Sequence, residues 1–191
     1  MTAAKEPLKR RIGIMIGSDS DLPQCLPGLL LLQEAEIKGL AQVNAIITSS
    51  IHRNTEEALL GLRTLTQEKG QKPVDRVNIW IIGAGCANHL TGTCDAYLRY
   101  YMENDFVPVI GVAFENNDPD KTLAAILSIE AVPGTQVIFD RNRHVGGIGF
   151  VNACHDAIHG DIPKLKIPPP KKIEVRTLSE AIAAGEEKEK K

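Results

Sequence analysis

Two side chains that can carry out acid–base and anion-binding chemistry stand next to each other after an apolar run. His52 and Arg53 belong to the segment Ser50-Ile51-His52-Arg53, which follows the apolar residues 43–47. An imidazole exchanges protons near neutral pH, and a guanidinium binds carboxylates and phosphates through paired donors. Buried strands more often end in residues that turn the chain, such as Gly, Pro, Asn or Asp. The pair predicts a proton carrier beside an anion clamp; a structural histidine with a solvated arginine is the alternative.

A second polar segment, residues 17–21, has the sequence Gly-Ser-Asp-Ser-Asp and also follows an apolar run. Glycine permits close backbone approach, and a hydroxyl beside helix N–H groups suits a phosphate. Serine and aspartate are also the commonest helix N-caps, so a purely structural cap is the alternative.

A third segment, residues 83–92, has the sequence GAGCANHLTG and follows the apolar residues 77–82. Its Gly-x-Gly resembles the start of a dinucleotide-binding turn. However, Asn88 stands where that fingerprint needs its third glycine, and the expected acidic residue does not end the next strand. A dinucleotide site is therefore disfavoured.

The elements that must position these segments alternate along the chain. Such alternation predicts an α/β fold, a three-layer, flavodoxin-like parallel sheet with helices on both faces. Ligands bind outside the carboxyl ends of such strands, where all three segments fall. The expected strands are residues 11–16, 43–48, 77–82, 107–114 and 136–139, and the expected helices are residues 22–38, 54–69, 89–104, 120–131 and 149–159.

Composition narrows the class of protein. The chain has 191 residues, 43% of them hydrophobic, which suffices for one core. The net charge of -2 and the 4% of aromatic residues give no sign of nucleic-acid binding. The apolar runs are too short to span a bilayer, and no apolar stretch follows the basic residues near the start. We expect a cytoplasmic protein with a single catalytic domain at residues 11–160. Residues 161–191 are expected to form an extension with a Pro-rich break, a short helix near residues 178–184 and a charged tail.

Metal sites and disulfides are not expected. Cys25, Cys86, Cys94 and Cys154 are scattered and form no CxxC pair, which favours reduced thiols. His155 and His159 lie one helical turn apart, a spacing that could hold zinc, but the sequence shows no third ligand.

Taken together, the three segments resemble one enzyme family. Their order and content are similar to those of the 5-aminoimidazole ribonucleotide carboxylases and carboxy-mutases of purine biosynthesis, which carry G-S-x-S-D, S-A-H-R and G-A-G-G-A-A-H-L-P-G after successive strands. The resemblance covers residues 11–160 and includes Pro108-Val109-Ile110-Gly111-Val112 and Asn152-Ala153.

The resemblance implies a site, a reaction and an assembly. It implies transfer of a carboxylate from a substituent nitrogen to a ring carbon, without a metal or other cofactor. His52 would be the catalytic acid–base residue. A homo-octamer is expected, with no nucleic-acid or membrane partner. The implied ribonucleotide-binding residues are Ser18, Asp21, Ser50, Arg53, Gly83, Ala84, Gly85, His89 and Leu90.

The motifs divide between two classes within the family. Arg53 and His89 match the mutase, which rearranges N5-carboxyaminoimidazole ribonucleotide to 4-carboxy-5-aminoimidazole ribonucleotide. Asn88 and Thr91 match the carboxylase, which uses carbon dioxide directly. We expect the mutase. The alternatives are the direct carboxylase and an inactive nucleotide-binding relative, the latter because Ile51, Asn88 and Thr91 depart from the mutase pattern.

Overall fold

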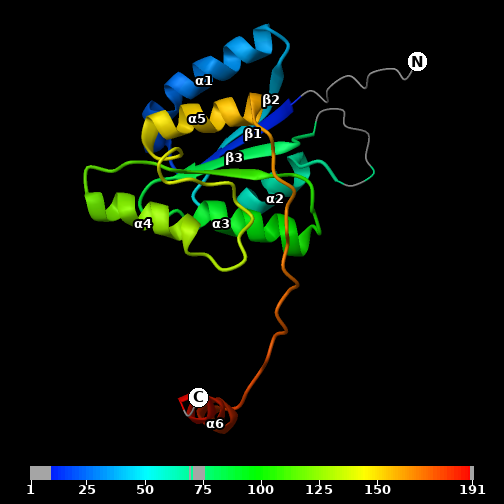
Figure 1. The fold of residues 1–191 in the computed structure, drawn as a ribbon, viewed down its shortest axis with the longest axis vertical. Coiled ribbons are helices and arrows are strands. Elements are labelled where there is room, and N and C mark those ends of the chain that lie inside the picture. The colour runs from blue at the N-terminus through cyan, green and yellow to red at the C-terminus, as the bar shows by residue number, and fades with distance from the viewer. Residues whose placement is uncertain (1–9, 69, 71–75, 190–191) are drawn as a thin grey trace.

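A four-stranded parallel sheet forms the centre of the molecule (Figure 1). The computed structural model describes residues 10–68, 70 and 76–189. The strand order β2-β1-β3-β4 is that of doubly wound, flavodoxin-like proteins. The expected α/β, three-layer fold is confirmed. The strands are β1 (Arg10–Ile16), β2 (Ala41–Thr48), β3 (Ile79–Ala84) and β4 (Val109–Ala113).

Helices cover both faces of this sheet (Figure 1). α1 (Leu22–Ile37) and α5 (Gly146–His159) pack together on one face. The other face carries α2 (Thr55–Leu65), α3 (His89–Ala96) and α4 (Pro119–Glu130). Each of these two helical layers therefore covers the apolar side chains on one face of the sheet.

The strands supply both cores by alternation. Ile14 of β1 and Ile81 of β3 belong to the core beneath α1 and α5. Their neighbours Met15 and Trp80 belong to the core beneath α2 and α3. Successive side chains of a strand point to opposite faces, so a continuous apolar run is what a sheet covered on both sides requires.

The expected fifth strand is reduced to a single bridge. Ile138 pairs with Ile110 of β4, but residues 136–139 form no further ladder. The N–H of Gln136 donates to the carboxylate of Asp95 at 2.8 Å. A backbone donor that is bound to a side chain is lost to the sheet, which explains why the apolar sequence alone was misleading.

Several helix ends differ from expectation. In place of one helix over residues 89–104, α3 ends at Ala96 and a π-helical turn, η2 (Tyr97–Tyr101), follows it. α5 begins at Gly146, three residues earlier than expected, where φ is +69°. Asn54 is the N-cap residue of α2, but its side chain makes no capping hydrogen bond. α2 ends at Leu65, and residue 69, its expected end, lies outside the described residues.

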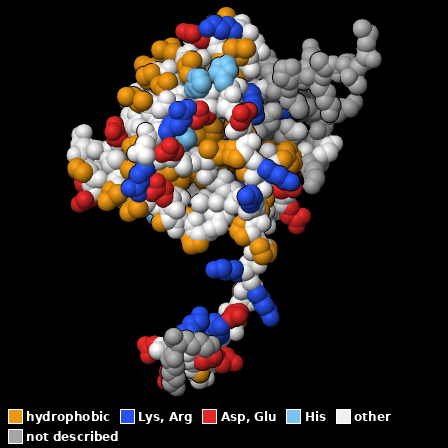
Figure 2. Space-filling view, in the orientation of Figure 1, with side chains coloured by type: hydrophobic (Ala, Val, Ile, Leu, Met, Phe, Trp, Pro, Cys, Tyr) orange, Lys and Arg blue, Asp and Glu red, His pale blue; other side chains and the backbone are white. Residues whose placement is uncertain are grey.

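Beyond α5 the chain leaves the body of the molecule. Residues 160–177 are irregular and lead to α6 (Leu178–Glu189), which lies away from the sheet and carries side chains of both charges (Figures 1 and 2). α6 extends beyond the helix expected near residues 178–184. In the parts of the chain that the structure describes, no helix has the length and apolar character needed to cross a membrane.

Candidate functional site

The three segments singled out in the sequence meet at the carboxyl edge of the sheet. The N–H of Gly17, after β1, donates to the carbonyl of Gly83 in β3 at 2.9 Å. The N–H of Ser49, after β2, donates to the carbonyl of Ile16 at 2.9 Å. Parallel pairing therefore continues past the strand ends and places the three loops side by side.

The first loop presents a hydroxyl and a carboxylate. Ser18 caps a short 3-10 turn, η1 (Asp19–Asp21), and its Oγ accepts from the backbone N–H and the hydroxyl of Ser20. Oδ2 of Asp21 accepts from the N–H of Gly85 in the third loop at 3.4 Å. Burial raises the pKa of Asp21, and the bond from Gly85 opposes this rise. Ser18 thus acts as a cap in this structure, while its expected role toward a ligand stays a prediction.

The second loop is a turn anchored by one buried side chain. The carbonyl of Ser50 accepts from the N–H groups of Arg53 at 3.1 Å and Asn54 at 2.9 Å. Ile51 is 7% exposed and packs in the core beneath α2 and α3. The side chains of His52 and Arg53 are exposed. Within the described residues no carboxylate pairs with Arg53, so its guanidinium can bind an anion.

A histidine of the third loop meets the histidine of the second. Nε2 of His52 lies 2.8 Å from Nδ1 of His89, the first residue of α3. The two rings are edge to face, with centroids 4.9 Å apart and planes at 80°. The sequence placed both residues in the site but gave no indication that they touch.

Three residues that depart from the family pattern, Ile51, Asn88 and Thr91, are buried beneath the site. Asn88 caps α3, since its Oδ1 accepts from the N–H of Thr91. Its Nδ2 donates to the carbonyl of Val112 in β4, and the Thr91 hydroxyl donates to the carbonyl of Ile82 in β3. Asn88 and Thr91 have no exposed surface. Their polar groups bind the framework, and they present no side chain at the surface.

Leu90 also points inward. It is 2% exposed and packs in the same core as Ile51 and Leu62. Its side chain anchors the start of α3 and thereby the position of its neighbour His89. Its expected contact with a ligand stays a prediction.

Small residues in the third loop are required by close packing. A Cβ at Gly83 would lie 2.8 Å from the ring of Phe114. A Cβ at Gly17 would lie 2.6 Å from the Cβ of Ala84. At Gly85 a Cβ would approach Oδ1 of Asp21 to 3.3 Å. The glycines let the first and third loops approach each other closely; Gly83 and Ala84 are buried and Gly85 is half-buried.

Cys86 follows Gly85 in the third loop. It is exposed and has φ of +55°, a left-handed conformation that favours glycine. Nδ2 of Asn116, in the loop after β4, lies 3.9 Å from its Sγ. The family pattern has glycine at this position, which was the signal in the sequence for the left-handed turn.

A second histidine contact, between His144 and Asp156, is structural. Nδ1 of His144 accepts from the N–H of Asp140 at 3.1 Å, and Nε2 lies 3.2 Å from Oδ2 of Asp156. Both ring nitrogens are thus occupied, and the ring is 2% exposed. Arg143 also binds Asp156, and together with His144 it lowers the pKa of that carboxyl.

No metal cluster is apparent in the described residues. His155 and His159 are exposed with ring centroids 5.1 Å apart, but no group of three or more His, Cys, Asp or Glu side chains gathers there or elsewhere among those residues.

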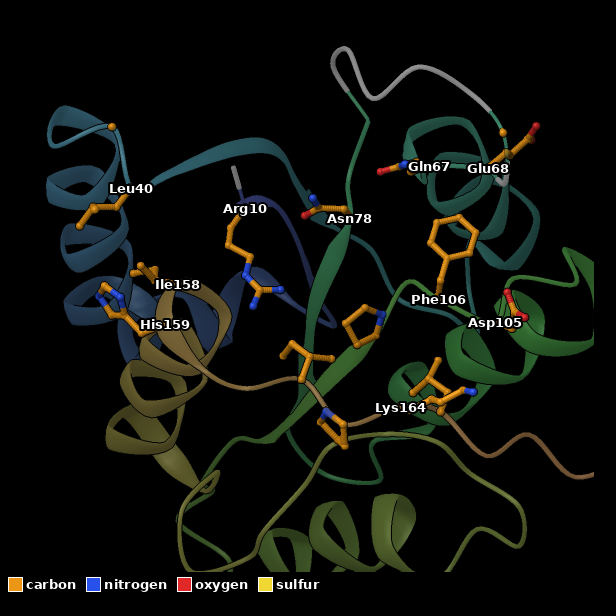
Figure 3. A pocket seen from close by; sticks show the side chains of 16 residues that line it. Arg10, Leu40, Gln67, Glu68, Asn78, Asp105, Phe106, Ile158, His159 and Lys164 are labelled. Atoms are coloured by element: carbon orange, nitrogen blue, oxygen red, sulfur yellow. The ribbon is translucent and has the colours of Figure 1, made fainter. Parts of the chain in front are cut away.

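A hollow lies at the opposite, amino edge of the sheet (Figure 3). It has a volume of about 1270 Å³ and lies where the strands begin, between Arg10, Leu40, Asn78 and Pro108. Figure 3 shows Arg10 between His159 on one side and Phe106 on the other. None of the three loops contributes to its lining. The candidate site is therefore assigned to the three loops and not to this hollow.

Comparison with known proteins gives two matches. Residues 11–139 match the family described as AIR carboxylase. The chain is also similar to an N5-carboxyaminoimidazole ribonucleotide mutase of Pyrococcus abyssi, with 30% identity over 133 residues. That match covers 68% of this chain and 66% of the relative. All three loops fall within the matched residues.

Proposed function

The chain belongs to the AIR carboxylase family, and on this premise we propose that it is an N5-carboxyaminoimidazole ribonucleotide mutase of purine biosynthesis. Its product would be 4-carboxy-5-aminoimidazole ribonucleotide. The observation that carries the proposal is that the exposed His52 and Arg53 and the carboxylate of Asp21 lie on neighbouring loops at one edge of the sheet.

The reaction needs one proton to be given and one to be taken. Protonation of the carbamate nitrogen breaks the bond to its carboxylate, and the electron pair of that bond stays on nitrogen as carbon dioxide leaves. The electron-rich ring carbon then attacks the carbon dioxide and becomes tetrahedral. Loss of its proton restores the aromatic ring. One imidazole can supply the first proton and accept the second, and we assign both steps to the exposed His52.

Binding groups flank this proton carrier. The Arg53 guanidinium suits the ribonucleotide phosphate, because a planar cation binds a phosphate through two parallel hydrogen bonds. The hydroxyl of Ser18 would add a donor to the phosphate, and the carboxylate of Asp21 would accept from a ribose hydroxyl. Gly83 and Ala84 are buried and Gly85 is half-buried. Following the family resemblance, we assign their backbone to the side of the site on which a flat ring and carbon dioxide would lie.

The mutase is favoured over an inactive relative by the burial of three divergent residues. Ile51, Asn88 and Thr91 are 7%, 0% and 0% exposed, so these three substitutions add no exposed side chain to the site. The direct carboxylase stays as the second candidate, since Asn88 and Thr91 match its pattern.

Turnover assays on two substrates test this proposal. We expect the purified protein to convert N5-carboxyaminoimidazole ribonucleotide without added bicarbonate, at a rate that carbonic anhydrase does not change. Carboxylation of aminoimidazole ribonucleotide at low bicarbonate, with no conversion of the carbamate, would identify the direct carboxylase. A protein that binds either ribonucleotide but converts neither would be the inactive relative.

A further inference from the structure

The contact between His52 and His89 constrains which nitrogen of His52 can act. At 2.8 Å, Nε2 of His52 and Nδ1 of His89 are within hydrogen-bond distance. Such a bond needs one proton between the two nitrogens, because two N–H groups or two lone pairs repel each other. Nε2 of His52 is therefore committed to His89.

The bond to His89 does not involve the other ring nitrogen of His52, Nδ1. In the described part of the chain, Nδ1 of His52 forms no hydrogen bond, and its ring is exposed. We propose that His89 is a positioning residue: it holds Nε2 of His52 and thereby makes Nδ1 of His52 the nitrogen that exchanges protons with the substrate.

Both rings are carried by rigidly anchored backbone, as such a role requires. Ile51 fixes the turn before His52 in the core. On the other side, the capping bonds of Asn88 and the buried Leu90 fix the first turn of α3. A positioned ring loses less conformational freedom on reaching the transition state, which is why catalytic histidines commonly have a partner on the nitrogen that does not react.

In the proposed reaction, Nδ1 of His52 then gives one proton and takes one back. The cationic His52 gives its Nδ1 proton to the carbamate nitrogen and becomes neutral, while its Nε2 proton stays in the bond to His89. After the carbon–carbon bond has formed, the ring carbon returns its proton to Nδ1, and its electron pair restores the aromatic ring. His89 neither gains nor loses a proton over the cycle. These proton transfers rest on the proposed function, whereas the hydrogen bond between His52 and His89 does not.

Two variants of His89 separate positioning from a structural role. His89→Ala removes the partner of Nε2. His89→Asn keeps a hydrogen-bonding atom near the position of Nδ1 but has no titratable ring. His155→Asn is the matched control, since His155 is an exposed histidine of α5 remote from the three loops in the sequence.

The primary measurement is nitrogen NMR on the ligand-free, ¹⁵N-histidine-labelled protein. We expect a scalar coupling between Nε2 of His52 and Nδ1 of His89 and, for neutral His52, a single tautomer with its proton position fixed by the bond. His89→Ala should abolish the coupling and give a mixture of His52 tautomers. His89→Asn should keep one tautomer, and His155→Asn should leave the His52 signals unchanged. His52 signals that do not respond to His89→Ala would overturn the proposal.

Kinetics provide the second measurement. His89→Ala should lower kcat by about 10- to 100-fold with little change in KM. This loss is smaller than the roughly 10²- to 10⁴-fold decrease expected when the acid–base residue itself is removed. His89→Asn should recover most of that loss. Equal loss in both variants would contradict a positioning role. If the NMR result holds but neither ribonucleotide is converted, the proposed reaction fails while the His52–His89 bond stands.

Discussion

The side chain of Asn88 donates to the carbonyl of Val112 at 2.9 Å and so fastens the first turn of α3 to β4. The same side chain caps the helix through its other atom, Oδ1. One buried amide thus connects a strand, a helix and the loop that carries His89. The position of the candidate site depends on this framework as much as on the exposed residues.

Replacement of Asn88 should therefore destabilise the fold. In Asn88→Ala the carbonyl of Val112 loses its partner and the helix loses its cap, each of which typically costs about 1–2 kcal/mol. Urea unfolding should show a decrease of about 2–4 kcal/mol in the free energy of unfolding. The control Asn117→Ala, at an exposed loop position, should change it by less than about 0.5 kcal/mol. Equal stability of the two variants would contradict this account.

Removal of the imidazole of His52 should affect chemistry more than binding. His52→Asn should lower the turnover of the carboxylated ribonucleotide by about 10²- to 10⁴-fold, the usual value of general acid–base catalysis. Equilibrium binding measured by calorimetry should persist, because the phosphate contacts remain. Near-normal turnover in this variant would remove His52 from the mechanism.

Arg53 should contribute mainly to binding. Arg53→Ala should raise KM and weaken equilibrium binding more than it lowers kcat, since the phosphate is remote from the reacting carbon. Some loss of kcat is expected because the remote group also orients the ring. Arg63→Ala, which removes an exposed arginine of α2, serves as the control. Unchanged binding of the ribonucleotide would assign the phosphate to another residue.

Acid should weaken the fold through Asp156. The hydrogen bonds from Arg143, then from His144, hold the pKa of Asp156 below its ordinary value of 3.8. A carboxyl whose pKa is lower in the folded state stabilises the protein fully above its unfolded pKa, and this contribution is lost as the pH falls through the folded pKa. Unfolding followed by circular dichroism from neutral pH downward should show that Asp156→Asn is less stable than the wild type near neutrality. The difference should shrink below pH 3.8. A difference independent of pH would exclude this linkage.

The family resemblance leads us to propose a homo-octamer. Apolar side chains gather over α1 and α5 on the face seen in Figure 2, and Leu26, Leu30 and Ile37 of α1 are 56%, 52% and 82% exposed. Such a stripe is more typical of an interface than of a monomer surface. Light scattering at micromolar concentration should give eight times the chain mass, 20.8 kDa. Leu30→Lys should shift the mass downward, whereas a wild-type monomer would contradict the proposal.

The sequence predicted the sheet because its signals were local. Continuous apolar runs before each loop indicated strands buried on both faces. The helix expected over residues 120–131 begins at Pro119 and is capped by the side chain of Asp118. At the start of α2 no side-chain cap forms, and the turn there is held by the carbonyl of Ser50.

Long-range contacts were beyond such reasoning. The carboxylate of Asp95 captures the N–H of Gln136, which is 41 positions away, and it also pairs with Arg99 inside the protein. No local pattern reveals that competition for a backbone donor. The contact of His52 with His89 is hidden in the same way, because it joins two strand ends 37 positions apart.

The left-handed turn at Cys86 gives the site a chemical handle. Burial raises the pKa of the thiols of Cys25 and Cys94 to about 12, and that of Cys154 also rises. All three are buried, whereas Cys86 is exposed. Because maleimides react with accessible thiolates, a fluorophore should attach at this one position, on the third loop, without any mutation. The native protein thus carries its own attachment point for an optical probe, whose emission could follow ribonucleotide binding in real time.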